Sequence, residues 1–303
     1  MAISRSQLVK ELEPGLNALF GLEYKRYENQ HAEIYTTESS DRAFEEEVML
    51  SGFANAQVKG EGAGVSYDEA QETFSARYTH ETVALAFAIT EEAIEDNLYD
   101  RISSRYTKAL ARSMSNAKQV KAVEPLINGL PATATFKSGD GVALFSTAHP
   151  TVAGTFANTL QTQADLNETS LEQSLIDIAA MTDERGLRIA ARGVKMIIPS
   201  ELQFTAERLM KSQGRVVTAD NDVNAIVSMG MIPQGYRVNN YLTDSDAFYI
   251  ITDVPNGMKM FQRVALTTGM EGDFDTGNVR YKARERYSFG VSDPRGIFGV
   301  EGS

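Results

Sequence analysis

The sequence contains no cysteine and no tryptophan among its 303 residues. Without cysteine, the chain has no disulfide bonds, no thiolate metal ligands and no cysteine nucleophile. Histidine is also scarce, and His31, His80 and His149 lie too far apart in the sequence to suggest a zinc site. No apolar run approaches the roughly 20 residues that span a bilayer, and the first six residues lack a signal-peptide pattern. We therefore expect a protein made in a cytoplasm, with no metal, no cofactor and no membrane partner.

Basic residues are too few to balance the acidic ones. The chain has 29 lysines and arginines against 41 aspartates and glutamates, which gives a net charge of −12. A sequence-specific DNA-binding domain usually has a charge of the opposite sign. The apolar fraction of 42% and the charged fraction of 23% are those of an ordinary globular protein. We expect a folded chain with one large domain or two to three smaller ones.

Motifs for catalysis are weak. Ser146 and His149 lie close together in the segment Ser-Thr-Ala-His-Pro, but no serine occupies a Gly-x-Ser-x-Gly turn. We expect His149 to be a loop histidine that is fixed by local hydrogen bonds. Gly60, Gly62 and Gly64 have the spacing of a phosphate-binding loop, but a strand pattern follows them where a helix would be needed. We expect no catalytic residues, and an ordinary α+β enzyme is kept only as an alternative.

Two segments have too little apolar surface to fold alone. Residues 1–50 are mostly polar and contain one helical stripe, which Pro14 and Gly15 interrupt, of Leu8, Leu12, Leu16 and Phe20. Residues 51–82 predict a long two-stranded extension with the three glycines at its tip. Neither segment can offset by itself the conformational entropy that is lost on ordering. We therefore expect both segments to lie on other copies of the same chain.

A long helix is predicted to follow the extension. Thr90 begins a helical pattern in which apolar residues recur every four positions from Ile94 to Met114, and Pro125 is expected to end the helix at about residue 122. Before it, the strand pattern changes phase near His80, which predicts a bend where the extension joins the body.

The strand pattern at residues 279–291 has two different faces. Its odd positions are mostly apolar, and four of its even positions are cations: Arg280, Lys282, Arg284 and Arg286. Because the strand and the long helix have similar lengths, we expect them to pack along each other. Between them, the sequence predicts a compact α+β unit with a helix at 170–185 capped by Ser170 and Gln173, a strand at 194–198, a helix at 199–214, and strands at 247–252 and 259–265.

These elements, in this order, resemble the major capsid proteins of tailed bacteriophages, which have the Hong Kong 97-type fold. Three segments carry the resemblance: Leu144-Phe-Ser-Thr-Ala-His-Pro150 with Asn158-Thr-Leu160, Val194-Lys-Met-Ile-Ile-Pro-Ser-Glu-Leu202, and Tyr281-x-x-Arg-x-Arg-Tyr-x-x-Gly-x-x-Asp-Pro-Arg295. The resemblance covers nearly the whole chain. It implies an α+β fold with an N-arm (1–50), an extended loop (51–82), a peripheral domain (83–167 and 265–303, with a spine helix at about 90–122) and an axial domain (168–264).

The resemblance also implies a function. Such a protein is a structural virion component that self-assembles into hexamers and pentamers of an icosahedral head around double-stranded DNA, which it contacts non-specifically. The implied partners are copies of itself, a portal, a scaffolding protein and, optionally, a decoration protein. We expect the scaffolding protein to be separate, because no long scaffolding segment precedes the arm, and we expect assembly in the host cytoplasm. The alternative is an encapsulin-like nanocompartment shell, which has the same fold and encloses protein cargo.

We expect the contacts between copies to involve the extended loop and the basic strand. The four cations are predicted to face acidic groups of a neighbour, either Glu45–Glu47 of the arm or Asp68, Glu69 and Glu72 of the loop. Lys59 and the glycines Gly60, Gly62 and Gly64 form the tip of the loop and are further predicted contacts. Some relatives crosslink a loop lysine to an asparagine, but the sequence shows no matching acceptor, so we expect no crosslink. Exposed ion pairs contribute about 0–1 kcal/mol each, so only a network of them would matter.

Overall fold

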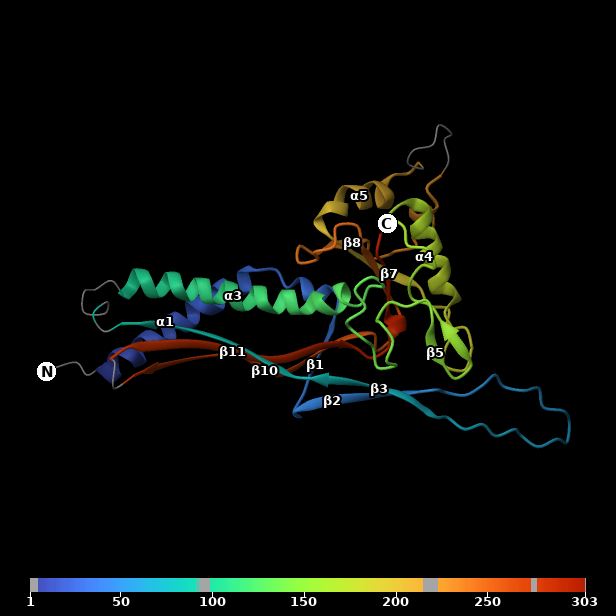
Figure 1. Ribbon diagram of the computed structural model, residues 1–303, viewed down its shortest axis with the longest axis horizontal. Coiled ribbons are helices and arrows are strands. Elements are labelled where there is room, and N and C mark those ends of the chain that lie inside the picture. Colours follow the sequence, from blue (N-terminus) through green and yellow to red (C-terminus); the bar gives the residue numbers. More distant parts are fainter. Residues whose placement is uncertain (1–4, 91, 93–98, 215–222, 274–276, 303) are drawn as a thin grey trace.

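The computed structural model describes residues 5–90, 92, 99–214, 223–273 and 277–302, with the backbone alone at 5–12 and 99–102. The molecule is elongated (Figure 1). A long body of helices and strands has a compact lobe at one end, and a loop projects beyond that end. The N-terminus lies at the far end of the body, and the C-terminus lies in the lobe.

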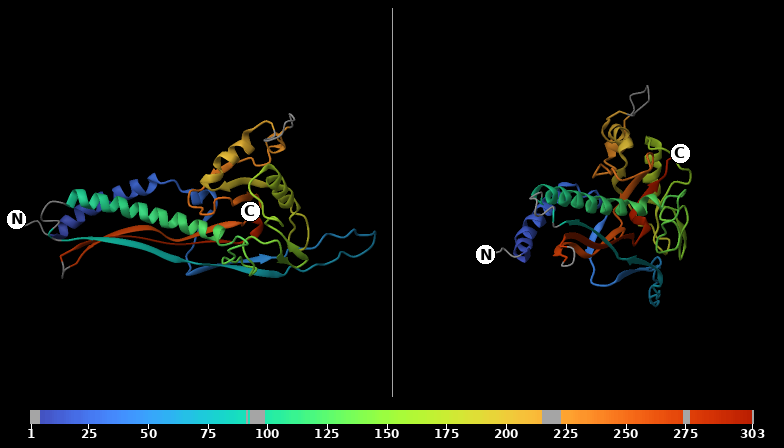
Figure 2. Two further views of the ribbon diagram at one scale, coloured as in Figure 1. Left: turned by 45° about the horizontal axis from the view of Figure 1, so that its top comes forward. Right: turned by 60° about the vertical axis from the view of Figure 1, so that its left-hand side comes forward.

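The body is one four-stranded sheet with two helices on one of its faces. The strand order is β1-β10-β11-β4, in which β1 is parallel to β10 and the other pairs are antiparallel. The helices α1 and α3 lie side by side along this sheet in both views of Figure 2. The bounds are α1 Arg5–Arg26, β1 Thr36–Ser39, β4 Glu81–Ile89, α3 Tyr99–Ile127, β10 Met258–Gly272 and β11 Val279–Val291, with a 3-10 turn η1 at Gln30–Glu33.

The predicted basic strand is confirmed with its bounds, because β11 runs from Val279 to Val291. Its odd positions are buried under the helices, apart from the half-buried Phe289. Leu110 and Met114 of α3 pack against Tyr281 of β11, so the long helix and the long strand lie along each other as expected.

The end of the long helix was predicted wrongly. We expected Pro125 to end it at about residue 122, but α3 continues to Ile127 with Pro125 in its last turn. Proline removes the bond to the carbonyl of residue 121, but Val123 and Leu126 on either side of Pro125 are anchored in the core and hold the last turn. The predicted start of the helix at residues 91 and 93–98 lies outside the described residues.

The lobe is a second four-stranded sheet with helices packed on it. Its order is β12-β9-β7-β8, and its core includes Leu171, Ile178, Met196, Phe248 and Phe298. The bounds are β5 His149–Thr151, β6 Gly154–Phe156, α4 Glu168–Ala180, β7 Gly193–Ile198, η2 Ser200–Leu202, α5 Gln203–Lys211, α6 Ala225–Met229, β8 Tyr236–Val238, β9 Phe248–Thr252, η3 Pro294–Gly296 and β12 Ile297–Val300. This agrees with the predicted α+β unit.

The first helix of the lobe begins and ends earlier than predicted. Asn167, rather than Ser170, is the N-cap of α4, and the two residues form a reciprocal capping box. The helix ends at Ala180, because Met181 turns to an extended conformation. The predicted end at residue 185 therefore falls in the following loop.

The sheets cross the expected boundary between the axial and peripheral segments. The division at 264/265 falls inside β10, which pairs with β11 along its length. The last strand, β12, pairs with β9 in the lobe, although it lies in the segment expected to be peripheral. The strand that begins near residue 259 was predicted to end at 265, but it continues to Gly272.

The extension begins as a hairpin. Strand β2 (Phe44–Leu50) pairs antiparallel with β3 (Glu72–Thr79), and residues 51–71 between them contain no regular strand. Strand β3 is separated from β4 only by His80, yet the two strands belong to different sheets. The predicted bend near His80 is therefore confirmed.

Candidate assembly surfaces

The N-terminal helix packs on its own chain. Leu16 and Phe20 of α1 are buried with Leu110 and Met114 of α3 and with Tyr281 of β11. The expectation that this segment could not bury itself is therefore wrong for the described part of α1. The helix runs unbroken through Pro14 and Gly15, so the apolar side chains beyond them stay aligned on the spine helix. The side chains of Leu8 and Leu12 lie outside the described residues.

A buried ion pair reinforces this contact. Lys118 Nζ of α3 lies 2.9 Å from Glu285 Oε2 of β11, and Tyr24 of α1 donates a hydrogen bond of 2.8 Å to Glu285 Oε1. Burial, and after it the charge of Glu285, raises the pKa of Tyr24, so the phenol stays protonated as the donor. One carboxylate thereby ties both helices to the sheet.

The extended loop has no comparable support. Val58 is 100% exposed and Tyr67 is 98% exposed, so neither side chain is covered by the described part of its own chain. The predicted tip residues Lys59, Gly60, Gly62 and Gly64 are all exposed. Gly62 has a φ of +75° in the turn at the tip, a conformation that favours glycine.

Among the described residues, the contacts that tie the loop to the lobe lie at the base of the loop. Asp68 accepts hydrogen bonds from the backbone N–H groups of Ala54 (2.7 Å) and Glu69 (2.9 Å), and these bonds hold the pKa of Asp68 below its usual range. Arg185 donates a bond of 2.5 Å to the carbonyl oxygen of Glu69 and lies 3.7 Å from Asp68. Asp68 is therefore already engaged within its own chain, whereas the side chains of Glu69 and Glu72 point to solvent.

The four predicted cations differ in their surroundings. Arg280, Lys282 and Arg284 are exposed on the sheet face opposite the helices, whereas Arg286 is half buried near His80. Arg280 forms an ion pair with Asp273. Within the described ranges, Lys282 and Arg284 have no ion-pair partner.

Small residues flank the cation row on both sides. The cross-strand partners of Arg280, Lys282 and Arg284 on β4 are Ala88, Ala86 and Ala84, and two of those on β10 are Gly269 and Thr267. Cross-strand partners lie on the same face of a sheet. Lys282 and Arg284 therefore have small neighbours on both sides, where another chain could approach closely, whereas Arg280 has Glu271 as its partner on β10.

The acidic residues predicted for the arm have partners within the chain. Glu45 accepts a hydrogen bond of 2.6 Å from Ser40, and Glu46 lies 3.7 Å from Arg77. Glu47 lies 2.5 Å from Lys259 and also accepts a hydrogen bond from Ser292. These contacts favour the exposed acids of the loop over Glu45–Glu47 as partners for a neighbour's cations.

His80 fixes the joint between the extension and the body. Its Nε2 lies 2.9 Å from Ser40 Oγ, and its Nδ1 lies 3.0 Å from Ser288 Oγ. Because the single hydroxyl proton of Ser40 is donated to Glu45, Ser40 accepts from Nε2–H and Ser288 donates to Nδ1. Burial, and after it the charge of Arg286, lowers the pKa of His80. The change of phase in the strand pattern predicted the bend but not these partners.

The described residues contain no recognisable catalytic centre. His149 is buried, with Nδ1 2.6 Å from Asp140 Oδ2 and Nε2 3.0 Å from Asn158 Oδ1, whereas Ser146 Oγ accepts from the Ala148 N–H. The prediction of a locally fixed histidine is therefore confirmed. No group of three or more potential metal ligands occurs in the described part of the chain, and no helix there is long and apolar enough to cross a membrane.

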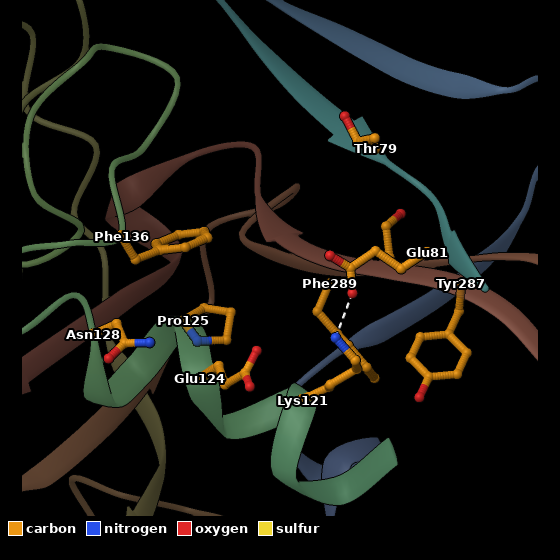
Figure 3. Close-up of a pocket in the computed structure, with 10 residues that line it drawn as sticks. Thr79, Glu81, Lys121, Glu124, Pro125, Asn128, Phe136, Tyr287 and Phe289 are labelled. Carbon is orange, nitrogen blue, oxygen red and sulfur yellow. Dashed lines mark hydrogen bonds and ion pairs between the residues drawn. The ribbon is translucent and has the colours of Figure 1, made fainter. Parts of the chain in front are cut away.

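A pocket of about 240 Å³ lies between the end of α3 and the joint at His80. Figure 3 shows Glu81 and Lys121 paired across it, with Phe136 and Tyr287 on its walls. This pairing compensates the charges of two groups that line the pocket.

Known structures share the fold of this chain. The capsid of an empty GTA particle is 14% identical over 90% of this chain and 89% of that chain, with a TM-score of 0.56. The capsid of Myoviridae phage XM1 is 11% identical over 89% of each chain, with a TM-score of 0.53. A virus-like particle from Pyrococcus furiosus is 11% identical over 94% of this chain and 98% of that chain, with a TM-score of 0.52. At these identities the likeness shows the fold, and the predicted α+β capsid fold is confirmed.

The family comparison goes further than the fold. No curated protein matches the chain. A family described as phage capsid protein matches residues 72–300, which is well over half of the chain. The match begins at β3 and includes the whole sheet of the lobe, the body sheet without β1, the spine helix and the basic strand. It does not favour the nanocompartment alternative, and by this match the chain belongs to the phage capsid protein family.

Proposed function

We propose that this major capsid protein forms hexamers and pentamers that close into an icosahedral head around double-stranded DNA. The observation that carries the proposal is the extended loop, whose apolar side chains at Val58 and Tyr67 are left in solvent by the isolated chain. A loop of this kind is stabilised when it covers a second copy, and a shell supplies such a copy to every subunit. The role is structural, without a catalytic step.

Electron microscopy of the purified protein tests this proposal. Closed shells of uniform size that contain DNA or carry a portal would support it. Shells filled with protein would favour a nanocompartment instead. Particles of only a few copies at every salt and protein concentration would contradict both shell functions.

For the domain organisation, we propose an N-arm at 1–50, an extended loop at 51–82, a peripheral domain around α3 and the long sheet, and an axial domain in the lobe. The pairing of β10 with β11 favours a boundary near residues 253–257 over one at 264. The pairing of β12 with β9 favours returning residues 297–300 to the axial domain. Limited proteolysis would test the new boundary, since we expect cleavage at Val254–Gly257 before any cut inside β10.

For the contact between copies, we propose that Lys282 and Arg284 of one subunit face the loop acids Glu69 and Glu72 of its neighbour, with Arg280 and Arg286 at the two ends of the row. The exposed row and its small flanking residues support this arrangement. The glycine tip with Lys59, Gly60, Gly62 and Gly64 reaches further along the neighbour, and Asp68 holds the base of the loop. Each pair contributes little alone, so the interaction depends on the network and on ionic strength.

We further propose a portal and a separate scaffolding protein as partners, with an optional decoration protein. In this proposal the packaged DNA makes only non-specific contacts, and assembly takes place in the host cytoplasm. The acidic net charge of −12 supports weak DNA contact, because it opposes binding to the phosphate backbone. Co-purification of assembling shells, followed by mass spectrometry, would identify these partners.

A further inference from the structure

A second pocket lies beneath the root of the extended loop, where the loop meets the lobe. It encloses about 360 Å³, which far exceeds the roughly 30 Å³ that one water occupies in the liquid. One wall is formed by Met49 and Leu50 at the end of β2, and the other by Ile189 and Val254 of the lobe. Leu50 is 60% exposed, so the chain itself leaves this apolar entrance uncovered.

The polar lining of this pocket is strongly acidic. Four carboxylates line it, from Asp183, Glu184, Asp253 and Asp293, against one guanidinium, from Arg295. Four negative charges and one positive charge give a formal charge of −3. Arg295 is already shared, because it lies 2.7 Å from Glu184 Oε1 and 3.2 Å from Asp293 Oδ1.

One of these carboxylates is buried without a full set of partners. Glu184 is only 2% exposed, and its Oε2 has no hydrogen-bond partner in the described part of the chain. A buried, charged oxygen that lacks a donor is costly, and such groups are normally paired. Glu184 therefore keeps one oxygen without a donor, beside the three other carboxylates that line the pocket.

The other two acids are also available to a ligand. Asp183 Oδ1 accepts hydrogen bonds from the backbone N–H groups of Arg185 and Leu187. Asp253 Oδ1 accepts one from the backbone N–H of Arg192. Neither makes a hydrogen bond through Oδ2 to a described residue. Arg185, a basic residue near the pocket, is already engaged by Asp68 and by the carbonyl of Glu69.

We propose that this pocket receives a basic side chain, an ammonium or guanidinium group, from a neighbouring copy of the chain. The inference rests on the proposed shell function, which brings such copies together. The apolar lining suits the methylene stem of a lysine or arginine, and the acids of the lining suit its charged end. A bare metal ion fits less well, because no three of the described acids converge as ligands.

The position of the pocket has a consequence for assembly. Because Met49 and Leu50 at the loop root form a wall, a side chain seated in the pocket also braces the direction of that subunit's own loop.

The double variant Asp183→Asn with Asp253→Asn tests the proposal. Each amide keeps an oxygen to accept the same backbone bonds, so the fold is preserved while two negative charges are lost. The matched control is Glu172→Gln with Glu201→Gln, which removes two charges from the lobe outside the pocket. Assembly is followed by light scattering and sedimentation, and folding by thermal unfolding of the dissociated subunit.

We expect the pocket variant to unfold at the same temperature as the parent but to assemble at least tenfold more slowly, while the control assembles at the parental rate. Equal assembly rates for the two variants would overturn the proposal. If the parent forms no shells, the proposed function fails instead.

Zero-length carbodiimide crosslinking of shells made from isotopically mixed copies gives a second readout, which does not depend on the variants. A crosslink from Asp183 or Asp253 to a lysine of another copy would support the proposal. The proposal would be rejected if the crosslinks from the pocket stay within one copy and the variants do not change the assembly rate.

Discussion

The N-terminal helix and the extended loop both have too little apolar surface to fold alone, yet the chain treats them differently. Helix α1 places Leu16 and Phe20 on the spine helix and ties Tyr24 to a buried carboxylate. The loop at 51–71 leaves Val58 and Tyr67 in water. A segment can thus be stabilised by its own chain when its apolar residues recur at helical spacing opposite a matching stripe. The loop lacks that periodicity, and its stabilisation must come from outside the subunit.

The largest expected effect is on the supported segment. Phe20 is 2% exposed, so Phe20→Ala should lower the free energy of unfolding by about 3–5 kcal/mol, through lost burial and a cavity. Urea denaturation of the dissociated subunit measures this. Leu22→Ala is the matched control, because Leu22 is 73% exposed and should change stability by less than about 0.5 kcal/mol. Similar losses for both variants would mean that α1 does not pack as described.

The second-largest loss of stability is expected when the cation that pairs with Glu285 is removed. Lys118→Met keeps most of the side-chain volume but leaves a carboxylate that is 1% exposed without its counter-charge, which should destabilise the subunit by about 3 kcal/mol. Adding Glu285→Gln should recover part of that loss, because the uncompensated charge disappears. Denaturation at neutral pH measures both variants, and an additive double variant would contradict the pairing.

Acid should lower the free energy of unfolding through the same region. Burial lowers the pKa of His31 from its ordinary 6.5 to about 4, so the folded state binds the proton less well than the unfolded state. The stabilisation is complete above about pH 6.5 and is lost as the pH falls toward 4, by about 2–3 kcal/mol in total. Denaturation midpoints across this window measure it. His31→Phe should flatten the curve, and a slope as steep as the parent's would exclude His31 as its source.

Shortening the loop should barely affect the subunit. Replacing residues 55–66 with two glycines keeps the bond from the Ala54 N–H to Asp68 and removes only exposed side chains. We expect a stability change below about 1 kcal/mol, because the entropy of loop closure varies slowly with length, together with loss of closed shells in electron microscopy. A glycine–serine loop of the original length separates the effect of length from that of side chains. Normal shells from the shortened chain would refute the role of the loop.

The smallest effect on the subunit is expected for the cation row. Lys282→Glu with Arg284→Glu should leave subunit stability nearly unchanged, because both residues are exposed. Shell yield should fall at low salt, since each lost pair is worth about 0–1 kcal/mol and the replacements repel acids. Lys282→Gln with Arg284→Gln is the milder control. A shell yield that matches the parent's at low and at high salt would rule out the proposed contact.

Much of the body was predictable because its signals are local. Alternation of side chains indicated β11 with its bounds, and the change of phase at His80 indicated the bend. The errors arose where tertiary contacts override local rules. Core packing of Leu126 carries α3 past Pro125, and pairing with β11 extends β10 to Gly272. The order of elements was enough to suggest the family.

The sites were less predictable than the fold. The alternation of side chains along the strand predicted that the four cations share one face. Their small neighbours could not be predicted in the same way, because the cross-strand partners depend on the register between strands. The acidic pocket was missed, because Leu50, Asp183, Asp253 and Arg295 come from four distant segments. No spacing rule joins such residues, so only the folded chain brings them together.

The one-residue link between β3 and β4 leaves the hairpin no slack. His80 is held on both sides of its ring, by Ser40 before β2 and by Ser288 in β11. A neighbour that displaces the loop therefore also twists the long sheet, because His80 joins the hairpin rigidly to that sheet. Shells of different curvature would then require differently twisted subunits rather than differently posed loops.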